Sequence, residues 1–154
     1  MRGYLIDANH IGAWEKASAA FMVRLNQKPP ERLIFISVVT LGELEWGLST
    51  TTTTDSERRK QGRAFIDQEL RPYALDLTVT TSGTYAEILR RIWHAHPPAN
   101  SRVRTEAHLL SLGVDINDVW MVAAASERGL TVLTEDKMSV IRAAAPHVEF
   151  ECWN

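Results

Sequence analysis

The sequence predicts an α/β fold in which helices flank a mostly parallel central sheet. Short apolar runs with the length of buried strands recur along the chain, for example at residues 33–36 and 130–134. Between them lie longer segments whose apolar residues repeat at helical spacing. Strands that alternate with helices are joined by crossovers, which pair them in parallel. A chain of 154 residues fits one domain, so we expect a single domain over residues 1–154.

The first half of the chain is expected to begin with a strand and to alternate from there. The apolar run that ends at Asp7 suits a short buried strand, and Ser37 resembles the N-cap of a helix. Pro29 and Pro30 end the first helical pattern. The predicted elements are a strand over 3–6, a helix over about 10–26, a strand over 33–36, a helix over 38–48, a low-complexity loop over 49–54 and a helix over about 56–70.

The second half of the chain continues the alternation of strands and helices. Gly129 is expected to end the helix before it, whereas Asp76 weakens the strand pattern around it. The predicted elements are a strand over 74–79, a helix over 82–94, a loop over 97–101, a short helix over 105–112, a helix over 116–128, a strand over 130–134, a helix over 137–144 and an edge strand over 148–152.

Composition and charge indicate a protein of the reducing cytosol. The formal net charge is −2, which gives the chain no general affinity for polyanions but leaves nucleic acid open as a substrate. Cys152 is the single cysteine and cannot form an internal disulfide. The first apolar run is too short for a signal peptide, and no window reaches the roughly 18 apolar residues of a membrane span. We therefore expect a cytoplasmic protein with no membrane contact.

Four acidic residues lie at or just beyond the ends of predicted strands. They are Asp7 after the first strand, Glu43 in the helix after the second, Asp118 in the first turn of a later helix, and Asp136 after the strand that follows it. Ligands of open parallel sheets bind beyond the carboxyl ends of the strands, so these acids are expected to converge. No histidine or cysteine cluster accompanies them, and all-oxygen sites suit Mg²⁺ or Mn²⁺ rather than zinc. Two such ions about 3.5–4 Å apart can promote phosphodiester hydrolysis.

Each acid also has a purely structural interpretation when it is taken alone. Asp7 suits a strand-end turn, and Asp136 suits a helix cap. Asp115 and Asp118 together suit a carboxylate capping pattern, and Glu43 suits an exposed helix face. Four acids at one edge of a sheet are harder to explain as separate caps, which favours a metal-dependent site.

Four sequence blocks resemble the PIN domain family. They are residues 4–9 (YLIDAN), residues 36–47 (ISVVTLGELEWG), residues 116–124 (INDVWMVAA) and residues 129–136 (GLTVLTED). The blocks follow the order of the family and span nearly the whole chain. Among PIN domains, the chain most resembles the VapC-type toxins of type II toxin–antitoxin systems.

The resemblance implies an activity, partners and a set of site residues. The implied activity is that of a Mg²⁺- or Mn²⁺-dependent endoribonuclease, the toxin of a toxin–antitoxin pair, which hydrolyses RNA phosphodiester bonds. The implied partners are an RNA substrate and a cognate antitoxin protein, in a homodimer or a toxin–antitoxin hetero-oligomer. The implied catalytic and metal-binding residues are Asp7, Glu43, Asp118 and Asp136, with Asn9 and Thr134 as supporting polar groups.

The chain departs from the family pattern at two points and leaves one choice open. Ala8 stands where relatives usually carry threonine, and the segment 96–114 is longer than in typical relatives. Periodicity alone does not choose between Glu43 and Glu45, because this helix is apolar on most of its surface. The resemblance favours Glu43, and a semi-buried Glu45 then needs a partner. Asp115 competes with Asp118 in the same way, with capping as its expected role.

Three other functions compete with the nuclease interpretation. A haloacid-dehalogenase-like phosphatase needs a second aspartate two residues after the first, where this chain has Asn9. A receiver-like acidic binding module needs paired acids after the first strand, and this pattern is not evident. A catalytically silent PIN-like module is the third alternative, although the complete set of acids argues against it.

Overall fold

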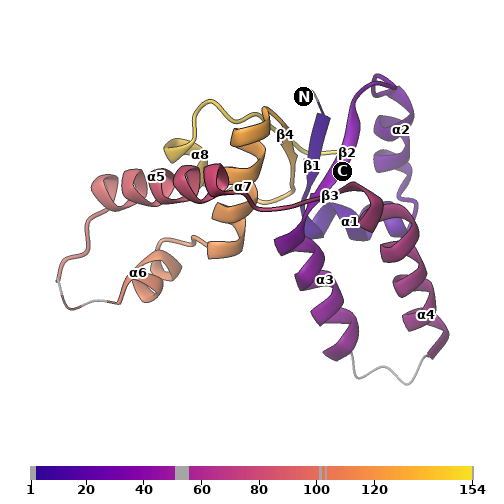
Figure 1. Cartoon of the computed structure of the whole chain (residues 1–154), viewed down its shortest axis with the longest axis horizontal. Helices are drawn as coiled ribbons and strands as arrows, with labels where there is room; N and C mark the ends of the chain where they lie inside the picture. Colours follow the sequence, from indigo (N-terminus) through magenta and orange to yellow (C-terminus); the bar gives the residue numbers. More distant parts are fainter. Residues whose placement is uncertain (1–2, 51–55, 101, 103, 154) are drawn as a thin grey trace.

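The five strands among the described residues form one parallel sheet, which confirms the predicted fold class (Figure 1). The computed structural model describes residues 3–50, 56–100, 102 and 104–153. The strands are β1 (Gly3–Ile6), β2 (Leu33–Ser37), β3 (Ala74–Leu75), β4 (Thr131–Leu133) and β5 (Phe150–Glu151). Their order is β3-β2-β1-β4-β5, and every pairing between neighbours is parallel. The strand that leads to Asp7 therefore lies at the centre of the sheet.

Helices cover both faces of the sheet. They are α1 (Ala8–Glu15), α2 (Ala19–Gln27), α3 (Val38–Thr50), α4 (Ser56–Phe65), α5 (Val79–Ala95), α6 (Thr105–Ser111), α7 (Ile116–Arg128) and α8 (Ser139–Ala144). A π-helical turn (Ile66–Leu70) and a 3₁₀ turn (Arg71–Tyr73) join α4 to β3. Figure 1 shows α5, α7 and α8 on one side of the strands and α1 to α4 on the other.

Local signals fix the ends of α7 where the sequence predicted them. Asp115 accepts a hydrogen bond from the backbone N–H of Asn117 at its start. Gly129 ends the helix at φ 62°, a conformation that glycine adopts without strain. No single helix among the described residues is long and apolar enough to cross a membrane; α6 and α7 meet those criteria only together and are bent by 85°.

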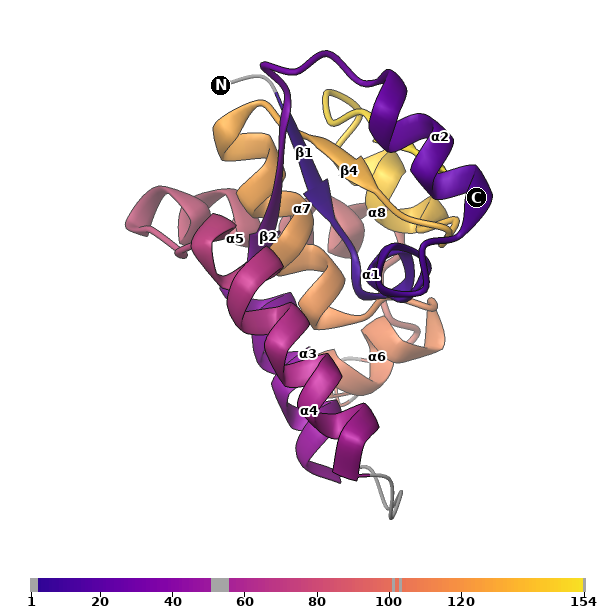
Figure 2. The same ribbon diagram turned by 90° about the vertical axis from the view of Figure 1, so that its right-hand side faces the viewer.

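The prediction of one helix over residues 10–26 is wrong, because the segment forms α1 and α2 with a turn between them. Ala17 has φ 49°, and the backbone N–H of Ser18 donates to the carbonyl of Ala13, which closes the end of α1. Both helices bury a residue, Ile11 and Phe21 respectively, so the apolar spacing continues across the break and conceals it. Figure 2 views α1 nearly along its axis and α2 from the side.

Other boundaries differ by a few residues. β3 contains two residues rather than six, because the chain leaves the sheet at Asp76 and enters α5 at Thr78, a capping-box residue. α8 begins at Ser139 because Met138 adopts a left-handed conformation with φ 42°. α3 extends to Thr50, so residues 49–50 of the loop predicted over 49–54 are helical, and residues 51–54 lie outside the described residues. Residue 101 of the loop predicted over 97–101 also lies outside the described residues.

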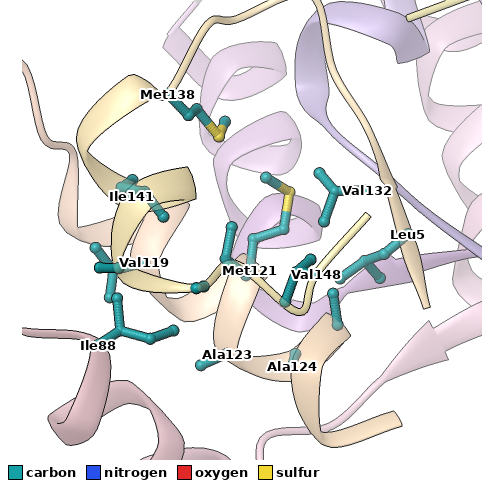
Figure 3. Packing of buried hydrophobic residues seen from close by; sticks show 14 of the residues in the cluster. Leu5, Ile88, Val119, Met121, Ala123, Ala124, Val132, Met138, Ile141 and Val148 are labelled. Atoms are coloured by element: carbon teal, nitrogen blue, oxygen red, sulfur yellow. The ribbon is translucent and has the colours of Figure 1, made fainter. Parts of the chain in front are cut away.

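The alternation of side chains along the strands divides the core into two clusters. Leu5 and Val132 face a cluster built with α5, α7 and α8, part of which Figure 3 shows. Small residues of α7 let that helix approach the sheet closely, and Ala123 and Ala124 are fully buried. Tyr4 faces the second cluster with α1, α2 and the π-helical turn. Burial on both faces holds the strands in register and fixes the positions of their ends.

Candidate active site

Asp7 is the central residue of the site. It follows β1, caps α1 by accepting a hydrogen bond from the backbone N–H of Ala8 at 2.6 Å, and is only 7% exposed. The hydroxyl of Thr134 donates to its second oxygen at 2.7 Å. Burial raises the pKa of the Asp7 carboxyl, whereas these two hydrogen bonds oppose the rise. Asp7 therefore also has a structural role that the sequence did not predict, since it caps α1 and lies in the candidate site.

Asn9 and Thr134 connect Asp7 to Asp136. The Asn9 amide donates to a carboxylate oxygen of Asp136 at 3.1 Å and to the hydroxyl oxygen of Thr134 at 3.3 Å. The backbone N–H of Asp136 donates to the same hydroxyl oxygen at 3.0 Å. The structure therefore places the two predicted supporting residues between two of the predicted carboxylates. Asn9 is 125 positions from Thr134 and 127 positions from Asp136 in the sequence.

Asp118 lies among the other acids. Its carboxyl is half-buried in the first turn of α7, and its pKa is raised to about 7, first by burial and then by the charges of Asp7, Asp115, Asp136 and Glu43. All of the predicted carboxylates thus contribute to one electrostatic environment at the carboxyl edge of the sheet. Carboxylates that repel one another in this way form a site that a cation stabilises.

Glu43 joins the site through a residue that sequence reasoning did not assign. Glu43 is exposed on α3, and the Asn117 amide donates to its carboxylate at 2.7 Å. This hydrogen bond ties α3 to the start of α7 and holds Glu43 beside the turn that carries Asp118. The pair Asn117-Asp118 was part of a recognised block, but nothing in one sequence shows that the amide reaches a side chain 74 residues away.

Glu45 and Asp115 have the structural roles expected of them. Glu45 forms ion pairs with Arg71 and, at 3.5 Å, with Arg63, so it joins α3 to α4 and the 3₁₀ turn. Glu45 is not among the charges that act most on Asp118, whereas Glu43 is. Asp115 caps α7 through the backbone N–H of Asn117 at 2.7 Å and adds negative charge near Asp118.

The donor chemistry of the site fits a hard divalent cation. Asp7, Glu43, Asp118 and Asp136 supply oxygen ligands only, which is the set that Mg²⁺ and Mn²⁺ prefer. Among the residues that the structure describes, no three His, Cys, Asp or Glu side chains already stand close enough to hold one ion. A cation held by three or more of these carboxylates would therefore need them to lie closer together than they do here.

Comparison with known proteins identifies the family. A sequence model of the PIN domain matches residues 4–145, a range that contains every acid of the site. This chain belongs to the PIN domain family. Ribonuclease VapC4 of Mycobacterium tuberculosis is 30% identical over 114 residues, which cover 74% of this PIN domain chain and 72% of that protein. Ribonuclease VapC5 of the same organism is 32% identical over 111 residues, which cover 70% of this chain and 66% of that protein. The resemblance to VapC-type PIN domains is thus confirmed.

Solved structures share the fold of this PIN domain. One is a chain in the crystal structure of DNA-bound VapBC from Salmonella typhimurium, with a TM-score of 0.70, 20% identity and 100% coverage of both chains. Another is a chain of VapBC2 from Rickettsia felis bound to a DNA fragment from the promoter, with a TM-score of 0.68 and 19% identity over 100% of both chains. At this level of identity the likeness concerns the fold, and the site rests on the residues described above.

Proposed function

We propose that this PIN domain is a Mg²⁺- or Mn²⁺-dependent endoribonuclease, the toxin of a toxin–antitoxin pair. The observation that carries the proposal is the hydrogen-bonded link from Asp7 through Thr134 and Asn9 to Asp136 at one edge of the sheet. The neighbouring carboxylates, together with burial, raise the pKa of Asp118. A structural cap needs one acid, whereas this edge has Asp7, Glu43 and Asp136 near Asp118. The related proteins named above as ribonucleases support hydrolysis of RNA.

The proposed mechanism assigns a role to each side chain. Asp7, Glu43, Asp118 and Asp136 would hold one or two divalent cations. Bound there, the cations would supply activation of a water and stabilisation of negative charge on the leaving oxygen of a phosphodiester. Thr134 donates to Asp7 and Asn9 donates to Asp136, so these two residues fix carboxylate orientation. Asn117 does the same for Glu43.

The substrate is proposed to be single-stranded or loop RNA, and the partner a small antitoxin that covers the site. Single strands and loops expose the backbone and bases that a duplex hides. The antitoxin follows from the VapBC complexes, which contain chains that share this fold. Homodimers or toxin–antitoxin hetero-oligomers are the expected assemblies, and the cytoplasm is the expected compartment.

RNA cleavage with a titrated cation tests the proposal. We expect the purified chain to cut single-stranded RNA in Mg²⁺ or Mn²⁺ and to be inactive in EDTA. Asp7→Asn should abolish cleavage and keep the fold, because the amide oxygen still accepts the Ala8 N–H but the ligand charge is lost. Cleavage by folded Asp7→Asn at the wild-type rate would remove Asp7 from the mechanism. A folded wild type that binds an antitoxin but cuts no RNA with any cation would favour a catalytically silent module.

A further inference from the structure

His10 is a buried polar side chain beside the second core cluster. It belongs to α1, its exposed fraction is 0%, and its ring packs edge-on against Phe21 with centroids 6.2 Å apart. Its two ring nitrogens nevertheless both have partners. Nε2 lies 2.9 Å from the backbone nitrogen of Trp153, and Nδ1 lies 3.0 Å from the side-chain oxygen of Asn9. His10 thus connects the segment after β5 with the residue between Asp7 and Asp136.

The partner at Nε2 determines the tautomer of the imidazole. The backbone nitrogen of Trp153 can only donate, so Nε2 of His10 must accept and cannot carry a proton. Neutral imidazole then carries its proton on Nδ1, which donates to the Asn9 oxygen. Burial lowers the pKa of His10, in keeping with a neutral ring.

Two donors determine which way the Asn9 amide faces, the Nδ1–H of His10 at 3.0 Å and the more distant backbone N–H of Glu135. With the oxygen toward His10, the amide nitrogen faces Thr134 and Asp136, where it donates to both. A flipped amide would set its N–H₂ group against the Nδ1–H of His10 and its oxygen against the carboxylate of Asp136. The backbone N–H of Glu135 also donates to the Asn9 oxygen, at 3.3 Å.

The segment that carries the Trp153 donor is anchored in the same core. The Trp153 ring lies 4.9 Å from the ring of Tyr4 and 5.4 Å from that of Phe21, centroid to centroid. Its indole N–H donates to Glu151 of β5 at 2.9 Å. Tyr4 belongs to β1, the strand that leads to Asp7, so the donor is held relative to the site by the central strand.

We propose that His10 is a positioning residue, whose tautomer, fixed by the Trp153 backbone N–H, orients Asn9 and through it Asp136 and Thr134. The proposal rests on the function proposed above, since it concerns the residues that orient the carboxylates of that site. Outer partners of metal ligands typically change metal affinity or activity by about 10–100-fold. His10 acts one hydrogen bond further away, so we expect the lower end of this range.

The first experiment concerns the tautomer alone and needs neither metal nor RNA. Nitrogen-15 NMR of the imidazole in the metal-free protein should show a protonated Nδ1 and an unprotonated Nε2. The opposite tautomer, or a doubly protonated ring at neutral pH, would overturn the proposal. This readout is independent of whether the chain is a nuclease.

A pair of substitutions separates the two hydrogen bonds of the ring. In His10→Asn the side-chain nitrogen takes the place of Nδ1, so the donor to Asn9 remains and the acceptor for Trp153 is lost. In His10→Gln the side-chain oxygen takes the place of Nε2, so the acceptor remains and the donor to Asn9 is lost. Ile66→Val removes a methyl group from the same cluster and serves as the control for core stability.

The expected result is a difference between the two variants that stability does not explain. His10→Gln should weaken Mn²⁺ binding on the order of tenfold and lower kcat by a similar factor, with little change in KM for RNA. His10→Asn and Ile66→Val should stay within about threefold of wild type. If His10→Gln binds Mn²⁺ as Ile66→Val does, His10 is only a core residue. If wild type binds Mn²⁺ but cuts no RNA, the nuclease proposal fails and the Mn²⁺ comparison still decides the role of His10.

Discussion

Two groups of acids in this PIN domain differ in their partners. On α5, Glu87 pairs with Arg90 at 2.7 Å and Arg91 at 2.8 Å, and these arginines lower its pKa to about 2. At the carboxyl edge of the sheet, Asp118 has a pKa of about 7, raised by burial and by other carboxylates. None of the ion pairs among the described residues involves the four acids proposed as ligands. Acids with arginine partners stabilise helices, whereas acids gathered without them repel one another, which is the charge pattern expected of the proposed cation site.

The comparison is sharpest on α3, where Glu43 and Glu45 represent the two groups. We predict that Glu43→Gln lowers RNA cleavage by more than about 100-fold, beyond the range typical of outer partners. Glu45→Gln should leave the rate within about threefold and lower the melting temperature slightly, because it weakens exposed ion pairs with Arg63 and Arg71. Cleavage rates and melting curves of both variants check this. The reverse ranking of the two rates would assign the ligand to Glu45.

The two groups of acids should make stability change with pH in opposite directions. Because the folded pKa of Asp118, about 7, exceeds its ordinary value of 3.8, the folded state holds the extra proton between these pH values. In EDTA, wild-type stability should therefore fall as pH rises from about 4 to 7. In Asp118→Asn, the fall in melting temperature between pH 4 and pH 7 should be smaller than in wild type by several degrees. A change of 1 kcal/mol in the free energy of unfolding corresponds to about 2–4 °C in a domain of this size. An identical slope in the variant would contradict the pKa assigned to Asp118.

The smallest effect is expected at Glu87. Its folded pKa of about 2 lies below its ordinary value of 4.5, so its contribution exists above pH 4.5 and is lost as pH falls toward 2. Glu87 is exposed to solvent screening, so Glu87→Gln should change the melting temperature by no more than about 2 °C at neutral pH. High salt should remove even this difference. If Glu87→Gln lowered the melting temperature by many degrees even at high salt, the ion pairs of Glu87 would stabilise the fold more than exposed pairs are expected to.

The sequence was sufficient for features with strong local signals. The apolar runs of β1, β2 and β4 and the limits of α7, set by Asp115 and Gly129, are short-range properties, as is the position of acids at strand ends. The break at Ala17 was not predictable from periodicity, because apolar spacing continues through it. The contacts of Asn117 with Glu43 and of His10 with Trp153 join residues 74 and 143 positions apart, and only the folded chain reveals them.

The stability response to Mn²⁺ tests most directly whether the unpaired acids form a cation site. Binding to the folded state alone adds about 2.7 kcal/mol at a hundredfold excess over the dissociation constant, or about 5–10 °C in melting temperature. We predict this rise for wild type and for the control Asp67→Asn, whose acid pairs with Arg71. Asp118→Asn should melt no lower than wild type in EDTA and gain clearly less from Mn²⁺. A constant deficit of Asp118→Asn in both buffers, with an unchanged response to Mn²⁺, would contradict the account and leave Asp118 a helix cap.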